Sequence, residues 1–180
     1  MRDFGIEQNY RLKIVDASFD NAFAYPKNTI IFTKSLLEKL DDDEFKAILG
    51  HEVGHHYYEH YKPAIIRAFI LSFFMGASQT PTVITSFLST FFSSKHSRDA
   101  ERESDRHSTE LMRAAGLDLS SNITAMRKIS AGVKESKYLS IMSTHPLTEK
   151  RIEYFNSQKD YKGEYSQSRD LILSLSLIHI

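Results

Sequence analysis

The stretch DDDEFKAILGHEVGHHYYEH, residues 41–60, carries the pattern on which both the predicted fold and the predicted site depend. Asp41, with Glu44 three positions further on, is typical of a capping box at a helix N-terminus. A helix that starts there places His51 and His55 about 40° apart around its axis and about 6 Å apart along it. Both imidazoles can therefore reach one metal ion.

Between His51 and His55, Glu52 is the residue that could take part in the reaction. It is rotated by about 100° from His51, which places its carboxylate beside the ion without making it a ligand. Zinc lowers the pKa of a bound water to about 7, and a carboxylate at this position can take the proton as the water attacks a peptide carbonyl. The pattern predicts zinc-dependent hydrolysis of peptide bonds, with Glu52 as general base and then as acid toward the leaving amine.

A catalytic zinc site needs a third protein ligand and an open fourth position. Glu101 is one candidate, and Asp105, four positions later, would accept the free ring N–H of a ligating histidine. Glu103 with His107 has the same spacing and is the alternative. The residues alone do not separate the two pairs.

The rest of the chain predicts an α+β fold that is mainly helical, with a small N-terminal sheet over the active-site helix. Alternation and β-branched runs indicate two early strands, a third between them and a terminal strand at residues 170–180. Helix composition, Gly116 as a terminator and Pro146 as a first helical residue indicate four more helices. The strands are expected at residues 10–15, 21–25 and 29–32, and the helices at 34–40, 97–117, 122–137 and 146–155.

Length and composition limit the classes of protein. The chain has 180 residues, which fits a single domain over residues 1–180, and its formal net charge is +0. A neutral chain lacks the positive field that nucleic-acid binding needs, so nucleic acid is not an expected partner. Because there is no cysteine, histidines and carboxylates must hold any metal. Residues 1–18 show no secretory-signal pattern, and compartment and oligomeric state stay open.

Several motifs together resemble the HtpX-like and CAAX-prenyl-protease-like zinc metallopeptidases, which are gluzincins. The resemblance covers residues 21–155. It rests on Asn-Ala-Phe-Ala, the Asp-Asp-Glu-Phe lead-in, the HExxH helix, Ser-Arg-x-x-Glu-x-x-x-Asp, and His-Pro followed by Arg-Ile. These motifs stand at residues 21–24, 42–45, 51–55, 97–105, 145–146 and 151–152.

The resemblance implies a zincin-like domain with one zinc ion, and it assigns roles to single residues. It makes Glu101 the third ligand and Asp105 the carboxylate behind a ligating histidine, in preference to Glu103 and His107. It places His145 near the scissile carbonyl, where it would stabilise the oxyanion.

For the substrate, the resemblance implies an extended polypeptide that pairs with an edge strand. The strand residues are Asn21, Ala22, Phe23 and Ala24. It also favours a membrane-associated or cell-envelope location and a role in protein quality control. The integral-membrane members of the family have spanning helices around the catalytic domain.

Residues 68–94 form an apolar, uncharged segment that is long enough for one membrane-spanning helix. A single crossing would put His51 and His55 on one side of a bilayer and Glu101 on the other, and two crossings would need about 40 apolar residues. The segment is therefore expected to be a helical insertion that is buried, covers the cleft, or dips into a membrane face.

A rival hypothesis is a non-catalytic binding module with a structural zinc site. His107 or Glu103 would then be a fourth ligand, and a closed tetrahedral set leaves no water to activate. Such a module has no need of Glu52, so the presence of this carboxylate favours catalysis.

Overall fold

The computed structural model describes residues 10–63, 66, 97–131 and 145–158. Within them, a three-stranded sheet and five helices form an α+β fold that is mainly helical, as the sequence predicts. The strands are β1 (Arg11–Val15), β2 (Ala22–Tyr25) and β3 (Thr29–Thr33). The helices are α1 (Lys34–Leu37), α2 (Asp42–Tyr57), α5 (Arg98–Ala114), α6 (Ser121–Ala131) and α8 (Glu149–Gln158).

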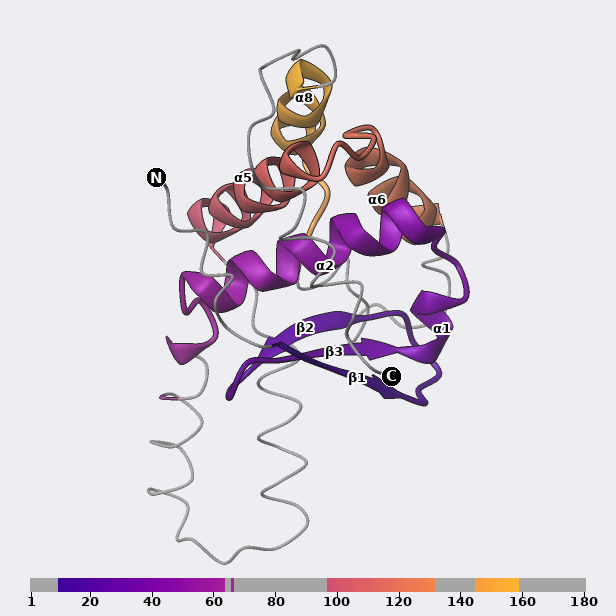
Figure 1. Cartoon of the computed structure of the whole chain (residues 1–180), viewed down its shortest axis with the longest axis vertical. Helices are drawn as coiled ribbons and strands as arrows, with labels where there is room; N and C mark the ends of the chain where they lie inside the picture. Colours follow the sequence, from indigo (N-terminus) through magenta and orange to yellow (C-terminus); the bar gives the residue numbers. More distant parts are fainter. Residues whose placement is uncertain (1–9, 64–65, 67–96, 132–144, 159–180) are drawn as a thin grey trace, which may run out of the picture.

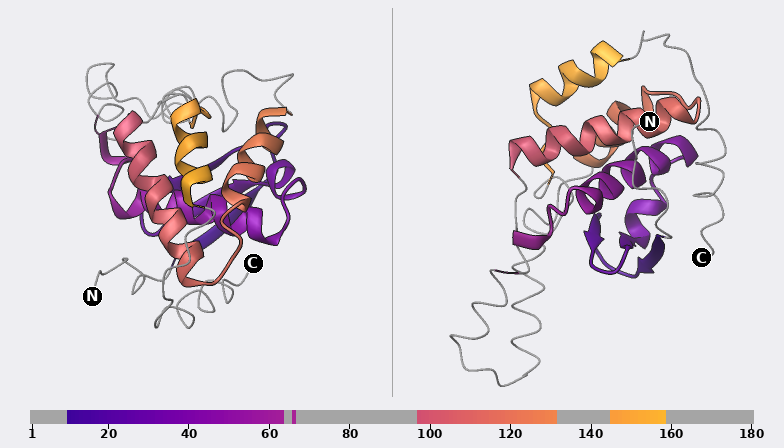
Figure 2. Two further views of the ribbon diagram at one scale, coloured as in Figure 1. Left: turned by 90° about the horizontal axis from the view of Figure 1, so that it is seen from above. Right: turned by 60° about the vertical axis from the view of Figure 1, so that its left-hand side comes forward.

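The elements are stacked in layers, with α2 at the centre (Figure 1). The sheet lies against one side of α2, α5 and α6 lie against the other, and α8 packs on α5 and α6 (Figure 2). A helix covered on both sides has little solvent-facing surface, and α2 is buried continuously from Ala47 to His56. The two histidines and Glu52 therefore lie inside the molecule.

The sheet has the order β1-β3-β2, with β1 parallel and β2 antiparallel to β3. Ala22 and Ala24 of β2 and Ile30 and Phe32 of β3 are buried and belong to the main hydrophobic core, together with side chains of α2. Ala22 pairs with Phe32 and Ala24 with Ile30. Strand β2 is thus an edge of the described sheet, and it lies next to α2.

The predicted capping box begins α2. The Asp41 carboxylate accepts hydrogen bonds from the backbone N–H groups of Asp43 and Glu44, and the Glu44 carboxylate accepts one from the backbone N–H of Asp41. Lys128 on α6 also binds the Glu44 carboxylate, with 2.6 Å between Nζ and Oε2. These bonds set where the helix starts, and so which of its faces carries His51 and His55.

Small residues let α2 and α5 cross closely. A Cβ atom built on Gly54 would lie 2.9 Å from Cα of Ser104, and one on Gly50 would lie 3.2 Å from Cα of Ser108. Real Cβ atoms essentially never come as close as 2.9 Å, so position 54 requires glycine at this separation of the two helices, whereas a Cβ at position 50 would need Ser108 to shift by a few tenths of an ångström. The close approach brings Glu101, one turn before Ser104, toward the histidines of α2.

Several element boundaries differ from those predicted; helix α1, for example, ends at Leu37, not at residue 40. Helix α8 begins at Glu149, not at Pro146. The backbone N–H of Arg151 points to both the carbonyl and the hydroxyl oxygen of Thr148, so Thr148 marks the start of the helix. Helix α5 begins after Ser97, whose hydroxyl accepts the N–H of Ala100, and Gly116 follows its end with φ of 67°.

Two predicted features lie outside the described residues: the apolar insertion at 68–94 and the terminal strand at 170–180. Among the helices that are described, none combines the length and apolar character that a membrane crossing requires.

Candidate metal centre

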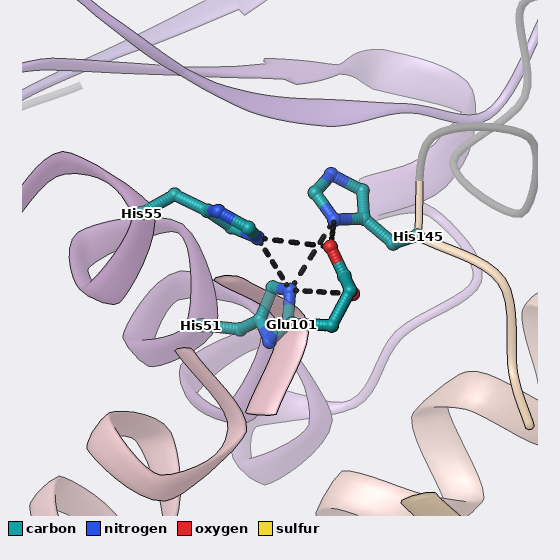
Figure 3. Close-up of side chains that lie close together, drawn as sticks. All are labelled: His51, His55, Glu101 and His145. Atoms are coloured by element: carbon teal, nitrogen blue, oxygen red, sulfur yellow. Dashed lines mark hydrogen bonds and ion pairs between the residues drawn. The ribbon is translucent and has the colours of Figure 1, made fainter. Parts of the chain in front are cut away.

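Three elements bring four potential metal ligands together (Figure 3). His51 and His55 come from α2, Glu101 from α5, and His145 from the segment before α8. One ligand atom of each residue lies within 4.8 Å of all the others, and all four side chains are buried. The structure thus gathers both histidines of the motif and the carboxylate of the predicted third ligand.

The spacing of these atoms fits a small metal ion. Nε2 of His51 lies 3.0 Å from Nε2 of His55, and the Glu101 carboxylate oxygens lie 3.5 Å and 3.3 Å from these two nitrogens. A tetrahedron with zinc-to-ligand distances of about 2.1 Å has edges of about 3.4 Å. Buried imidazole nitrogens and a carboxylate converging at this spacing form a donor set that suits zinc.

His145 completes the cluster as a fourth potential ligand. Its Nδ1 lies 2.9 Å from Oε1 of Glu101 and 3.3 Å from Nε2 of His51. The other ring nitrogen, Nε2, lies 3.4 Å from Oε1 of Glu52. His145 therefore contacts both the ligands and the predicted base, a position compatible with metal binding and with the expected role beside the scissile carbonyl.

Asp105 lies next to His51, the first histidine of the HExxH motif, on the side of the ring that faces away from the metal position. Its Oδ1 is 3.0 Å from Nδ1 of His51, so the carboxylate can accept the ring N–H while Nε2 faces the metal position. Burial alone would lower the pKa of His51, but Asp105 and Glu101 outweigh it and raise this pKa to about 9. Without a metal, the His51 ring therefore holds its proton more firmly than an ordinary imidazole does.

The sequence assigns Arg151 no part in the chemistry; an arginine at this place is expected only to pair with carboxylates and hold helices together. Its guanidinium forms two parallel bonds of 2.7 Å to Asp105, and Nη1 lies 2.9 Å from Oε2 of Glu101. The same Nη1 donates to the carbonyl oxygens of His145 and Pro146. Arg151 thus joins two helices and the His145 segment. In the sequence, the feature that could have pointed to this role is an arginine on the inward face of the last helix, shortly after the His-Pro motif.

Glu52 is fully buried and lies between the cluster and β2. Burial raises its pKa, and this effect is opposed chiefly by His145 and His51 and in part by the backbone N–H of Ala24. Burial also acts to raise the pKa of Glu101, but the three imidazoles of the cluster hold it well below its usual value. Glu101 is therefore the ionised carboxylate at the metal position.

The charges of the site are unbalanced without a cation. Three buried carboxylates, on Glu52, Glu101 and Asp105, face the single buried guanidinium of Arg151. Isolated buried charges are costly, so the arrangement requires either protons or a cation to compensate the excess. A divalent ion would bring the formal sum of these groups to zero.

The alternative third ligand does not lie in the cluster. The side chain of Glu103 is 50% exposed and pairs with His60, with 3.0 Å between Oε2 and Nε2. His107 is buried, and its ring stacks on Tyr57. Of the two pairs left open by the spacing, the fold brings Glu101 and Asp105 to the HExxH histidines and directs Glu103 and His107 elsewhere.

The predicted substrate strand lies on the side of the site toward the sheet. Asn21, Ala22 and Ala24 are buried, and Phe23 is partly exposed. The backbone N–H of Asn21 donates to the hydroxyl of Thr33, which fixes the start of β2. An edge strand beside a metal cluster offers a surface for an extended chain, although its use by a substrate stays a prediction.

The family model of peptidase family M48 matches residues 2–159, which include every described element. No curated protein gives a significant match to the chain.

Proposed function

The chain belongs to peptidase family M48, whose members are zinc metallopeptidases with polypeptide substrates, and we propose that it is an endopeptidase with one zinc ion held by His51, His55 and Glu101. One observation carries this proposal. A buried cluster of metal-ligand type stands beside a buried carboxylate that has the place of a general base.

When bound, zinc would supply an activated water and polarise a peptide carbonyl. The rest of the reaction is assigned to the side chains. Glu52 takes the proton of the attacking water and returns it to the leaving amine, and the burial that raises its pKa suits a group that both accepts and gives a proton. Asp105 holds the ring N–H of His51, so that Nε2 of this ligand faces the ion.

His145 is proposed to act on the substrate. A ring N–H near the scissile carbonyl would stabilise the oxyanion, and removal of one such donor costs about 100-fold to 1,000-fold in kcat. Its Nε2 lies 3.4 Å from the Glu52 carboxylate, which supports a place beside the water that Glu52 would activate. The variant His145→Phe should therefore lose activity while it retains zinc.

The substrate is proposed to bind as an extended strand along β2, through Asn21, Ala22, Phe23 and Ala24. The position of β2 at the edge of the described sheet and next to α2 supports this mode. Within the family, the HtpX-like or CAAX-prenyl-protease-like groups and a role in protein quality control are proposals that rest on the motifs. The single domain over 1–180 and the terminal strand at 170–180 are proposals from chain length and residue alternation. The apolar segment 68–94 is proposed to be a helical insertion that is buried, covers the cleft or dips into a membrane face.

The test is the pair of proteins that differ only at Glu52. Glu52→Gln should bind one zinc ion per chain, as the parent does, and should cleave an unfolded protein substrate at least about 1,000-fold more slowly. Equal cleavage by variant and parent would disprove the role of Glu52. Zinc content measured on the same samples separates loss of the base from loss of the metal.

The second candidate function is a structural zinc site in a binding module. The observation in its favour is His145, whose Nδ1 lies close enough to Glu101 and His51 to make a fourth ligand. In that case the parent would not cleave peptides. His145→Phe would then weaken zinc binding, which the catalytic hypothesis expects it to leave intact. The two hypotheses thus predict opposite results for one variant.

A further inference from the structure

The second ligand, His55, has a hydrogen-bond partner different from that of His51. Its Nδ1 lies 3.0 Å from Nδ1 of His60, and Nε2 of His60 lies 3.0 Å from Oε2 of Glu103. His60 follows the end of α2, and Glu103 comes from α5. A chain of contacts therefore runs from the metal cluster through His60 to a carboxylate that reaches the surface.

Only one assignment of protons satisfies both contacts if His55 binds a metal through Nε2. A neutral imidazole carries one proton, so His55 must then hold it on Nδ1 and donate it to His60. Nδ1 of His60 accepts, which leaves the proton of His60 on Nε2. This N–H points to the Glu103 carboxylate, which only accepts.

The end of α2 is shaped in a way that delivers His60 to this position. The backbone N–H of His60 donates to the carbonyl of His55 at 2.9 Å, and that of Glu59 donates to the carbonyl of His56 at 3.0 Å. Together these bonds form a Schellman motif. Its left-handed residue, usually glycine, is Glu59 with φ of 57°. A non-glycine residue in this conformation is strained.

We infer that His60 and Glu103 are positioning residues of the metal centre, which fix the proton and the ring orientation of His55 so that its Nε2 faces the ion. This inference rests on the proposed function, because it takes the ion at the cluster as given. The partners behind metal-bound histidines typically contribute 10-fold to 100-fold in metal affinity or activity. Glu103, the alternative ligand in the sequence, thus acts one step further from the metal.

The two histidine ligands would then be supported unequally. His51 is held by Asp105, which is buried and clamped by Arg151. His55 is held by His60, whose own partner Glu103 is half-exposed. Loss of His60 or Glu103 should weaken zinc binding without disturbing the core. The inference can therefore be tested in folded protein.

The experiment measures the zinc dissociation constant of the full chain by competition with a chelator. His60→Phe keeps a ring but removes both bonds, and it should raise the dissociation constant by about 10-fold or more. Glu103→Ala should raise it by about threefold to tenfold, and Glu103→Gln, which keeps an acceptor oxygen, should recover most of that loss. Arg102→Ala is the matched control, since this exposed side chain one position away pairs with Asp99 and should leave the constant unchanged.

A second readout is the position of the ring protons in the zinc-loaded parent, from 15N–1H spectra of the histidine side chains. The expected result is a proton on Nδ1 of His55 and on Nε2 of His60. A proton on Nδ1 of His60, or dissociation constants of His60→Phe and Glu103→Ala within twofold of the parent, would overturn the inference while the parent still binds zinc and cleaves peptides. If the parent binds no zinc, the proposed function and the inference are both wrong.

Discussion

At the scale of single residues, Arg151 is the side chain on which the buried charges converge. It bonds to Asp105 and Glu101 and to two backbone carbonyls. Arg151→Met would leave two buried carboxylates without their cation, and breaking a buried ion pair in this way costs about 3–5 kcal/mol. Urea unfolding of the metal-free protein measures this loss.

The matched variant at this position is Arg151→Lys. It keeps the charge but cannot form two parallel bonds to one carboxylate, so its stability should lie between those of the parent and Arg151→Met. A change below about 1 kcal/mol for Arg151→Met would contradict the central place given to the guanidinium.

The choice between the two carboxylates of α5 is also a matter of single residues. Glu101→Ala should reduce zinc affinity at least about 1,000-fold, because a ligand is removed from the ion, whereas Glu103→Ala should change it by tenfold or less. Zinc content after dialysis distinguishes the two. Retained zinc in Glu101→Ala together with lost zinc in Glu103→Ala would show that the third ligand is assigned to the wrong residue.

At the scale of elements, the site depends on how closely α2 and α5 cross. Gly54→Ala would place a methyl group 2.9 Å from the backbone of Ser104, so the helices must separate. Overpacking of this kind costs about 1–3 kcal/mol, and it moves Glu101 away from His55. We expect Gly54→Ala to lose stability in urea and to bind zinc more weakly than the parent.

Ser104→Ala is the control at the same crossing. The hydroxyl of Ser104 is buried and has no hydrogen-bond partner within the described part of the chain. Ser104→Ala removes this hydroxyl and adds no volume, so stability should be unchanged or higher. Destabilisation by Ser104→Ala equal to that by Gly54→Ala would mean that close packing is not what the glycine provides.

How far the elements could be predicted depends on how local their signals are. The capping box at Asp41 and Glu44 and the terminator Gly116 involve neighbours in sequence, and both were predicted correctly. The start of α8 was not, because Pro146 looks like a first helical residue. In the structure the carbonyls of His145 and Pro146 instead accept bonds from Arg151. A contact of that kind is not visible in a local pattern.

At the scale of the whole molecule, the stability of the metal-free protein should depend on pH through His107. Burial, with a smaller effect of His51, lowers the pKa of His107 to about 4, whereas the unfolded chain has an ordinary value of 6.5. The unfolded state therefore binds more protons between these values. The contribution of His107 is complete above pH 6.5 and is lost as the pH falls toward 4.

Between pH 7.5 and pH 5.5 this linkage amounts to about 1 kcal/mol. The measurement is urea unfolding at the two pH values for the parent and for His107→Phe, which does not titrate. The parent should lose about 1 kcal/mol more than the variant on acidification. Equal losses would mean that His107 is not buried as a neutral ring.

The α+β class, the central helix and the ligand pattern could be predicted because they depend on spacing along one helix and on motifs. The preference for Glu101 over Glu103 came from the resemblance, since the two have equivalent spacing to their partners. What separates them is the rotation of α5 about its axis where it crosses α2. That rotation is set by Gly50, Gly54 and the serines opposite them, which is a property of the packed molecule.

The most direct test of the metal centre is a crystal structure of the zinc-loaded protein with anomalous scattering recorded at the zinc edge. The predicted result is one zinc ion bound by Nε2 of His51, Nε2 of His55 and the carboxylate of Glu101. An ion held by Glu103 or His107, or no ion at the histidines of α2, would contradict it.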